Sequence, residues 1–395
     1  MGLEIDNRIS DSIKDMRKYT PGKGEQEISE KFDVDDVVKL SSNENPQGCA
    51  LAVEKFLQEK NVNYGRYPDG ECRELREELA DFYNVDYEQI VVGNGSDEII
   101  DFALELVVSP GDEVIMAEPS FSQYELSTLV KGAEPVQVPL DEEYKHDLDA
   151  MLEAVSEKTR VVFICDPNNP TGTIVPGAEV KEFLEQLRDD ILVVIDQAYY
   201  EYVESSDYFR AFEHMEEHPN LLIMRTFSKI FGLAGLRVGY GIGNPEVIEA
   251  MHRIRKPFNV NSIAQSAAIK ALNCRRHLYK CRQINNNQRN FFEHNLEELG
   301  IEYIPSQANF ILINTEMPAE EAFKHFASRG IVVRTADSFG LDQWIRLTLP
   351  PNKYTDRVLD ALKDLKEKIY QAPFQSIIPS IITVRPKSTI IPLQY

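Results

Sequence analysis

The chain of 395 residues is 43% hydrophobic and 27% charged, and its 65 acidic and 42 basic side chains leave a formal net charge of −23. This acidic balance argues against non-specific nucleic-acid binding, and no apolar run approaches the roughly 18 residues that a membrane-spanning helix needs. We therefore expect the chain to bind neither nucleic acid nor membrane. Because the start lacks a signal peptide's apolar segment and the five cysteines are scattered, we also expect a soluble cytoplasmic protein.

Short apolar runs alternate with amphipathic segments between about residues 91 and 243. Helical patterns cover 97–108, 121–133 and 178–187, and strand-like runs cover 89–93, 112–119, 134–140, 160–167, 191–199, 221–227 and 236–243. Runs of continuous Val, Ile and Leu indicate strands that are buried on both faces. The sequence therefore predicts an α/β fold with a large domain built on a mostly parallel, seven-stranded sheet.

Beyond Pro257 the pattern changes to longer helices. Helical patterns at 274–300, 319–330 and 354–370 surround strand-like runs at 308–315, 330–335 and 343–350, which indicates a smaller α+β domain. We predict an N-terminal arm (1–35), a large domain (36–260), a small domain (261–371) and an extended tail (372–395). The tail is rich in Pro, Ile and Ser, and we assign it no role.

Two charged residues follow strand-like runs of the large domain. Lys229 lies just after 221–227, behind Ser228 and eight residues before Arg237. Such a lysine is usually a surface residue with a packed stem, but a desolvated lysine near another cation loses proton affinity and becomes a nucleophile. Asp196 ends the run "ILVVID", where a carboxylate needs a cation or a hydrogen bond. It could bind a cofactor's ring nitrogen, cap a helix, or pair with an arginine in the core.

Two glycine-containing segments also follow predicted strands. The segment "GNGSDE" (93–98) leads into a helix, whose first amides could hold a phosphate group, although ordinary helix capping explains the same residues. It does not fit the dinucleotide pattern G-x-G-x-x-G. The segment "DPNNPTG" (166–172) favours a tight turn. In that turn, the amide of Asn169 could donate a hydrogen bond to an oxygen on the ring of a bound cofactor. Both segments follow the carboxyl ends of predicted strands, which is where open α/β sheets bind ligands.

A third motif points to different chemistry. The segment "HMEEH" (214–218) fits the zinc-hydrolase pattern H-x-x-E-H, with His214 and His218 as ligands. Pro219 and a strand-like run follow at once, so no long helix carries the motif, and no third ligand stands out. We therefore predict no metal and interpret the segment as a solvated acidic helix end.

The segments "NENP", "GNGSDE", "PNNPTG", "DQAY", "TFSK" and "GLAGLRVGYG" occur in this order. Together they resemble the fold-type I aminotransferases that use pyridoxal 5′-phosphate. More narrowly, "YTPGK", "SSNENPQG", "RYPDG", "ANFILI", "GIVVR" and "SFGLDQWIRLTL" are similar to segments of the histidinol-phosphate aminotransferases, a group of class II members. The resemblance covers roughly residues 15–370. Any one motif is a weak signal, whereas six in order are a strong one.

The resemblance implies a set of residues around the cofactor ring. Lys229 would bond covalently to the cofactor and then move the substrate's proton. Asp196 would keep the ring nitrogen protonated, which makes the ring an electron sink. Asn169 and Tyr199 would bond the ring oxygen, and Phe121 would stack on the ring face.

The resemblance also implies residues around the cofactor phosphate. The backbone amides of Ser96 and Asp97, together with Ser228 and Arg237, would hold it. Tyr67 would reach the phosphate of the neighbouring subunit's cofactor, so the active unit would be a homodimer.

Two arginines would bind the substrates. Arg346 matches the position that grips a carboxylate, which suits glutamate and 2-oxoglutarate. Arg334 matches the position that meets the phosphate of histidinol phosphate, with Tyr19 as a helper. The implied reaction converts L-histidinol phosphate and 2-oxoglutarate to imidazole-acetol phosphate and L-glutamate, in histidine biosynthesis. Alternatively, both arginines are surface residues of edge strands.

The chain departs from the pattern at Gln197, where glutamate is usual, and in the tail. Two alternatives keep the fold: an aromatic amino-acid aminotransferase and a decarboxylase of phosphothreonine. Two others change the class: a zinc hydrolase at His214 and His218, and a non-catalytic binding protein, which the presence of Lys229 disfavours.

Overall fold

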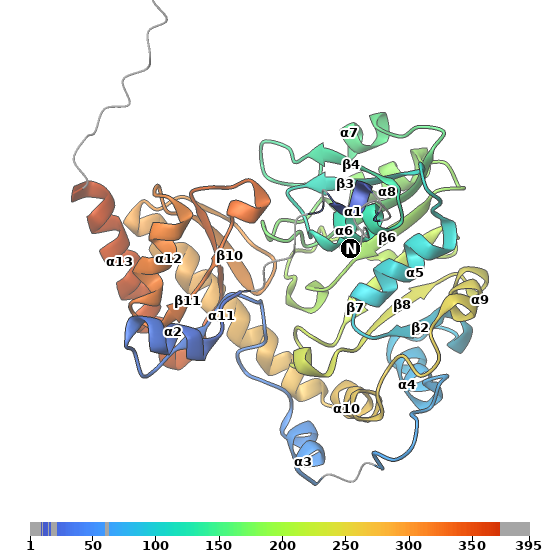
Figure 1. The fold of residues 1–395 in the computed structure, drawn as a ribbon, viewed down its shortest axis with the longest axis horizontal. Coiled ribbons are helices and arrows are strands. Elements are labelled where there is room, and N and C mark those ends of the chain that lie inside the picture. Colours follow the sequence, from blue (N-terminus) through green and yellow to red (C-terminus); the bar gives the residue numbers. More distant parts are fainter. Residues whose placement is uncertain (1–8, 10, 15, 17–21, 60–62, 372–395) are drawn as a thin grey trace, which may run out of the picture.

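The protein has two lobes joined by a long helix (Figure 1). The computed structural model describes residues 9, 11–14, 16, 22–59 and 63–371. Tyr19 and the tail beyond residue 371 lie outside these residues, so the predictions made for them stay predictions. None of the described helices is both long and apolar enough to cross a bilayer.

The larger lobe contains a seven-stranded sheet in the order β2-β8-β7-β6-β5-β3-β4. Only β8 runs antiparallel to its neighbours, which confirms the predicted mostly parallel sheet. The strands are β2 (Ile90–Gly93), β3 (Glu113–Glu118), β4 (Glu134–Pro139), β5 (Thr159–Cys165), β6 (Leu192–Asp196), β7 (Leu221–Thr226) and β8 (Gly239–Gly243).

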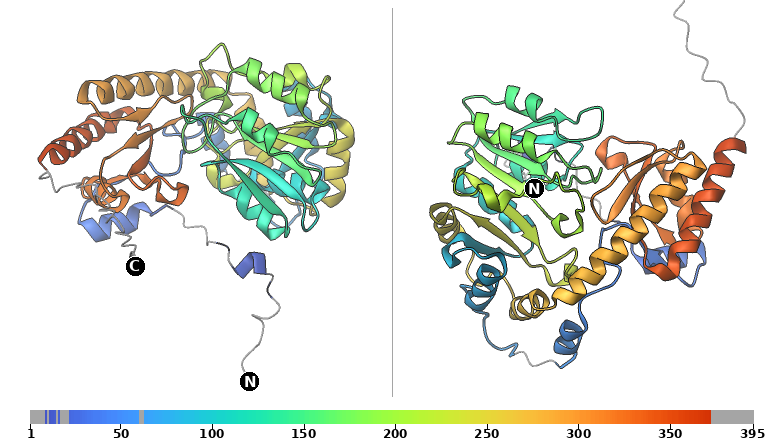
Figure 2. Two further views of the ribbon diagram at one scale, coloured as in Figure 1. Left: turned by 90° about the horizontal axis from the view of Figure 1, so that it is seen from above. Right: turned by 180° about the vertical axis from the view of Figure 1, so that it is seen from behind.

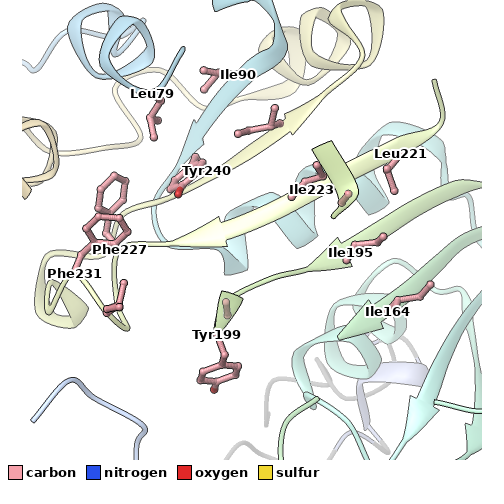
Figure 3. Packing of buried hydrophobic residues seen from close by; sticks show 14 of the residues in the cluster. Leu79, Ile90, Ile164, Ile195, Tyr199, Leu221, Ile223, Phe227, Phe231 and Tyr240 are labelled. Carbon is pink, nitrogen blue, oxygen red and sulfur yellow. The ribbon is translucent and has the colours of Figure 1, made fainter. Parts of the chain in front are cut away.

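Helices cover both faces of this sheet, and β2, β6, β7 and β8 are buried along their whole length, whereas the edge strand β4 is mostly not buried. Alternate residues of a strand point to opposite faces; Ile195 therefore belongs to one hydrophobic cluster and Val194 to another. Figure 3 shows Ile164, Ile195 and Ile223 on neighbouring strands of the first cluster. The helices are α3 (Leu51–Glu59), α4 (Arg73–Tyr83), α5 (Asp97–Val107), α6 (Gln123–Val130), α7 (Leu148–Glu153), α8 (Gly177–Gln186), α9 (Pro245–Ile254) and α10 (Ser262–Leu272).

Short polar side chains set where several of these helices begin. Asn244 accepts a hydrogen bond from the backbone N–H of Glu246, and Pro245 occupies the first position of α9. Asn261 and Asp147 cap α10 and α7 in the same way. Short helical turns complete the chain: α1 (Asp11–Lys14), η2 (Tyr87–Gln89), η3 (Tyr200–Tyr202), η4 (Ala211–His214), η5 (Ala234–Leu236), η6 (Asp337–Phe339) and η7 (Asn352–Tyr354).

The smaller lobe is built on a four-stranded sheet in the order β12-β13-β10-β9, which is antiparallel throughout. Its strands are β9 (Tyr303–Ile304), β10 (Phe310–Asn314), β12 (Arg334–Thr335) and β13 (Trp344–Thr348), and its helices are α2 (Glu25–Phe32), α11 (Arg275–Leu299), α12 (Ala319–Ala327) and α13 (Thr355–Gln371). Beside them, β1 (Val38–Lys39) pairs in parallel with β11 (Ile331–Val332). Figure 2 shows the two lobes from above and from behind.

The hydrophobic clusters of the two lobes meet within α11. Ala264 of α10 and Cys281 of α11 belong to the cluster of the larger lobe, whereas Phe292 belongs to that of the smaller lobe. Ile28 and Val38, near the N-terminus, also pack in the smaller lobe. We therefore propose a domain boundary inside α11, in place of the predicted one between residues 260 and 261, with residues 25–40 assigned to the smaller lobe.

Candidate active site

A cavity of about 400 Å³ lies where β5, β6 and β7 end. Cys165, Asp196 and Thr226, the last residues of these strands, line it together with side chains of the smaller lobe. This is the edge at which open α/β sheets bind ligands. The structure brings together eleven of the predicted site residues here: Ser96, Asp97, Phe121, Asn169, Asp196, Tyr199, Ser228, Lys229, Arg237, Arg334 and Arg346.

Lys229 lies three residues beyond the end of β7, in the loop that follows the strand. Its Nζ donates a hydrogen bond to the backbone oxygen of Ser42 at 3.3 Å and lies 5.4 Å from the centre of the Tyr199 ring. Burial, together with the nearby charge of Arg346, lowers the pKa of the Lys229 ammonium to about 8. Part of the amine is therefore uncharged near neutral pH, as a nucleophile or proton acceptor requires.

Asp196 is the last residue of β6 and is 4% exposed. One carboxylate oxygen accepts a hydrogen bond from the backbone N–H of Ala198 at 3.0 Å, and the other accepts one from the Tyr124 hydroxyl at 2.6 Å. Burial raises the pKa of Asp196 to about 6, while the bond from Tyr124 opposes that rise. The carboxylate lines the same cavity as Lys229, so both groups can act on one ligand.

One end of the cavity gathers groups that suit a phosphate. Arg237 pairs with Asp97 at 3.0 Å and donates to the Ser228 hydroxyl at 3.4 Å, beside the first residues of α5. Two glycines permit this approach. A Cβ on Gly95 would lie 2.6 Å from Arg237 Nη2, and one on Gly239 would lie 2.4 Å from the Ser96 nitrogen. A helix start, a guanidinium and a hydroxyl together form an anion site.

Hydrogen bonds to Asn169, Ser41 and Asn43 orient the far wall of the cavity. Arg346 donates through Nη1 to the side-chain oxygen of Asn169 and through Nη2 to the backbone oxygen of Ser41 at 2.8 Å. Asn43 donates to the Tyr199 hydroxyl at 3.0 Å. Because Ser41 and Asn43 come from near the N-terminus, this wall combines segments that are distant in the sequence.

The two predicted substrate arginines are neighbours across strands. Arg334 of β12 lies directly opposite Arg346 of β13, so their side chains project from the same face of the sheet. Both line the cavity, and Arg346 is buried while Arg334 is partly exposed. Two guanidinium groups on one side of the cavity favour anionic groups such as carboxylate or phosphate there.

The remaining predicted residues lie elsewhere. Tyr67 is 81% exposed and away from the cavity, with its ring stacked 4.5 Å from that of Phe258. His214 lies in the short turn η4, near Glu217 at 3.3 Å and against the Phe209 ring. Within the part of the chain that the structure describes, no cluster of three or more His, Cys, Asp or Glu side chains could hold a metal ion.

The family follows from the match of residues 35–362 to the family model described as aminotransferase class I and II. The chain belongs to this family. The histidinol-phosphate aminotransferase of Moorella thermoacetica is 41% identical to this aminotransferase over 359 residues, which cover 91% of this chain and 93% of that one. The histidinol-phosphate aminotransferase of Caldicellulosiruptor saccharolyticus is 42% identical over 353 residues, covering 89% and 98%.

Solved structures agree with the fold-type I assignment. The histidinol-phosphate aminotransferase of Sinorhizobium meliloti, in complex with pyridoxal-5′-phosphate, superimposes with a TM-score of 0.83 at 26% identity. That match covers 93% of this chain and all of the other. The enzyme of the same name from Clostridium acetobutylicum gives a TM-score of 0.77 at 27% identity, over 84% of this chain and 100% of that one.

Gln197, the departure from the family pattern, keeps a connecting role in this aminotransferase. Its side-chain oxygen accepts two hydrogen bonds from Arg225, at 3.1 and 2.7 Å, while the buried guanidinium packs 3.6 Å from the Tyr200 ring. Its amide nitrogen donates to the Tyr208 hydroxyl at 3.1 Å, which donates to the backbone oxygen of Asp166 at 2.5 Å. The amide therefore links the ends of β5, β6 and β7, where the site lies.

Sequence reasoning missed several groups around the site. Ser41 and Ser42 act through backbone carbonyls, and such groups leave no side-chain signal in a sequence. Tyr124 lies three residues after the predicted ring-stacking residue Phe121, and the two rings are in edge contact. Glu44, Cys165 and Thr226 also line the cavity.

The lowered pKa of Lys229 predicts a pH-dependent stability difference. Because burial lowers that pKa to about 8, the folded protein binds this proton less tightly than the unfolded chain, whose lysine pKa is about 10.4. The charged lysine therefore destabilises the fold at pH 7, and the penalty shrinks as the pH rises from about 8 to 10. We expect Lys229→Met to raise the cofactor-free protein's free energy of unfolding by about 3 kcal/mol at pH 7.

Urea unfolding of the wild-type and Lys229→Met proteins, both without cofactor, measures this difference at about pH 7 and pH 9.5. The advantage of the variant should be smaller at the higher pH. An advantage that stays constant or grows with pH would mean that Lys229 is not an ammonium strained by burial.

Proposed function

We propose that the protein is a pyridoxal-phosphate-dependent aminotransferase that interconverts L-histidinol phosphate and 2-oxoglutarate with imidazole-acetol phosphate and L-glutamate. One observation carries the proposal: the amine of Lys229, the buried carboxylate of Asp196 and two neighbouring arginines, Arg334 and Arg346, line one cavity. The names of the relatives support the same substrate. The reaction would belong to histidine biosynthesis and proceed in two half-reactions, with the amino group held on the enzyme between them.

The donor set of the cavity fits pyridoxal phosphate. Arg237, Ser228 and the start of α5 offer a cation, a hydroxyl and backbone amides for the phosphate. When bound, this cofactor supplies an aldehyde and an electron-accepting ring. Asp196 would hold a proton at the ring nitrogen, and its buried position excludes competing water.

The other ring contacts come from residues already near one another. Asn169 and Tyr199 would bond the ring oxygen and Phe121 would face the ring; all three line the cavity. Lys229 Nζ would bond the cofactor and then accept the proton from the substrate's Cα. A pKa of about 8 suits a general base near neutral pH, because it leaves a usable fraction of the amine uncharged.

The arginines would divide the two substrates between them. Arg346 would bind a carboxylate of glutamate, since a guanidinium pairs with carboxylates through two hydrogen bonds. Arg334 would bind the phosphate of histidinol phosphate, which has no carboxylate.

A homodimer in the cytoplasm completes the proposal. The Tyr67 side chain is exposed and does not line its own chain's cavity. It is held by stacking on Phe258, and in a dimer it would reach the phosphate in the neighbouring subunit.

Two measurements test the function. Purified protein is incubated with pyridoxal phosphate, reduced with borohydride, digested and mapped; the label should lie on Lys229. Release of glutamate from histidinol phosphate and 2-oxoglutarate is then measured beside phenylalanine and phosphothreonine. A label elsewhere, a higher kcat/KM with phenylalanine, or carbon dioxide released from phosphothreonine would refute the proposal.

A further inference from the structure

Asp196 has a partner that does not touch the cavity. The Tyr124 hydroxyl donates a hydrogen bond to Oδ2 of Asp196 at 2.6 Å. Tyr124 is not among the residues that line the cavity. Tyr124 is 1% exposed and Asp196 is 4% exposed. The bond therefore lies within the protein, behind the carboxylate as seen from the cavity.

Two ring contacts fix the position of the Tyr124 side chain on α6. Its ring stacks on that of Phe163 with centres 4.5 Å apart and planes 8° apart, and it meets the edge of Phe121 at 5.5 Å. The Thr128 hydroxyl donates to its backbone oxygen at 2.7 Å. A hydroxyl on a ring held this firmly constrains its acceptor, and the contact with Phe121 links it to the residue that would face the cofactor ring.

The pKa shifts of Tyr124 and Asp196 indicate that the tyrosine donates and the carboxylate accepts. Burial and the nearby Asp196 raise the pKa of Tyr124 well above its ordinary value, so its hydroxyl keeps its proton and can only donate to a carboxylate. Burial raises the pKa of Asp196, and the Tyr124 bond is the largest opposing influence. The other groups that interact electrostatically with Asp196 come from four further segments: Asp97 raises its pKa, Lys229 lowers it, and Cys165 and Tyr199 lie near it.

We propose that Tyr124 is a positioning residue, which holds the Asp196 carboxylate in place and keeps it ionised for the ring nitrogen of the cofactor. The role rests on the proposed function, because it acts through Asp196. A hydrogen bond to the charged form of an acid favours that form. Its removal should therefore weaken cofactor binding and move the loss of binding on acidification to higher pH.

The Tyr124→Phe variant tests the role, because it removes the hydroxyl and keeps the ring against Phe163. We expect the dissociation constant of pyridoxal phosphate, measured by absorbance titration, to rise about tenfold. The pH at which the bound cofactor's absorbance changes on acidification, the acid limb of its pH profile, should rise by about 1 unit. Tyr240→Phe is the matched control, since it also removes a buried tyrosine hydroxyl in a 2.6 Å hydrogen bond, here to Tyr83. It should change neither quantity.

A double-mutant cycle separates positioning from a general loss of packing. In an Asp196→Asn background, Tyr124→Phe should leave the dissociation constant unchanged, because no ionised carboxylate remains to be held. An undiminished effect in that background, or an unshifted acid limb in Tyr124→Phe alone, would overturn the proposal. Should Tyr124→Phe fail to fold, Phe163→Leu gives a second route. It loosens the ring while leaving the hydroxyl, and it should shift the acid limb in the same direction by less.

The outcomes for Tyr124 and for the proposed function can be told apart. A wild-type protein that does not bind pyridoxal phosphate at Lys229 would refute the function. A wild-type protein that binds it there, with Tyr124→Phe behaving like Tyr240→Phe, would refute only the role of Tyr124.

Discussion

Replacing Lys229 with alanine should lower the kcat for glutamate formation by about 10⁴-fold or more, because one amine would serve as both nucleophile and proton carrier. Its position explains why no neighbour can substitute for it. Of the other cations on the cavity wall, Arg237 pairs with Asp97 and Arg346 bonds to Asn169 and Ser41. Guanidinium groups remain protonated at any working pH, so they cannot accept a proton.

The matched control for Lys229→Ala is Lys229→Arg, which retains the positive charge and much of the length. Both variants should be equally inactive in a coupled assay of glutamate release, while circular dichroism shows an intact fold. Activity of Lys229→Arg within tenfold of the wild type would contradict the chemical role, because it would show that charge alone is enough.

Arg334→Ala should separate the two half-reactions. We expect kcat/KM for histidinol phosphate to fall by about 10²-fold, because an ion pair between a guanidinium and a phosphate is lost. The half-reaction with glutamate should change by less than about threefold, since its carboxylate would be held by Arg346. Single-turnover absorbance measurements with each amino donor would report the two rates separately.

Arg346→Ala is the reciprocal control, and its larger effect should fall on the glutamate half-reaction. Each replacement should therefore affect mainly one half-reaction. This outcome would distinguish the roles of the two arginines although they are neighbours on β12 and β13. Equal losses on both substrates from each variant would indicate a shared anion site and would contradict the division between phosphate and carboxylate. A loss with phenylalanine as great as with histidinol phosphate after Arg334→Ala would favour the aromatic alternative.

Much of the larger lobe could be predicted because most of its strands contain runs of apolar residues. The predicted strand at 221–227 and the observed β7 differ by one residue, and this placed Lys229 just beyond a buried strand. Asp196 was predicted to end its strand, and it is the last residue of β6. Parallel strands end at one edge, so residues that follow different strands meet there.

Contacts between distant segments could not be predicted in the same way. The backbone oxygen of Ser42 accepts from Lys229, 187 residues away, and no local pattern encodes such a pairing. α10 was assigned to the small domain from its helical character, whereas its alanines belong to the hydrophobic cluster of the larger lobe. Helical periodicity shows which face of a helix is buried but not which lobe buries it.

The same limit applies to Tyr124 and Gln197. Their importance lies in hydrogen bonds, from Tyr124 to Asp196 and from Arg225 to Gln197, that form only when α6, β6 and β7 are brought together. The sequence resemblance indicated Gln197 as a departure, but only the structure shows that an amide can serve there. It accepts from a cation and donates to a tyrosine, whereas a carboxylate could only accept.

The parallel pairing of Val38 with Ile331 has a consequence for the newly made protein. The segment that carries Ser41 and Ser42 leaves the ribosome roughly 290 residues before its partner strand, which corresponds to about 15–60 s of elongation. Throughout that interval the nascent chain can complete the strands of the larger sheet but not the wall of the cavity. A ribosome that stalls before residue 331 would therefore leave a fragment in which β1, next to Ser41 and Ser42, has no partner strand.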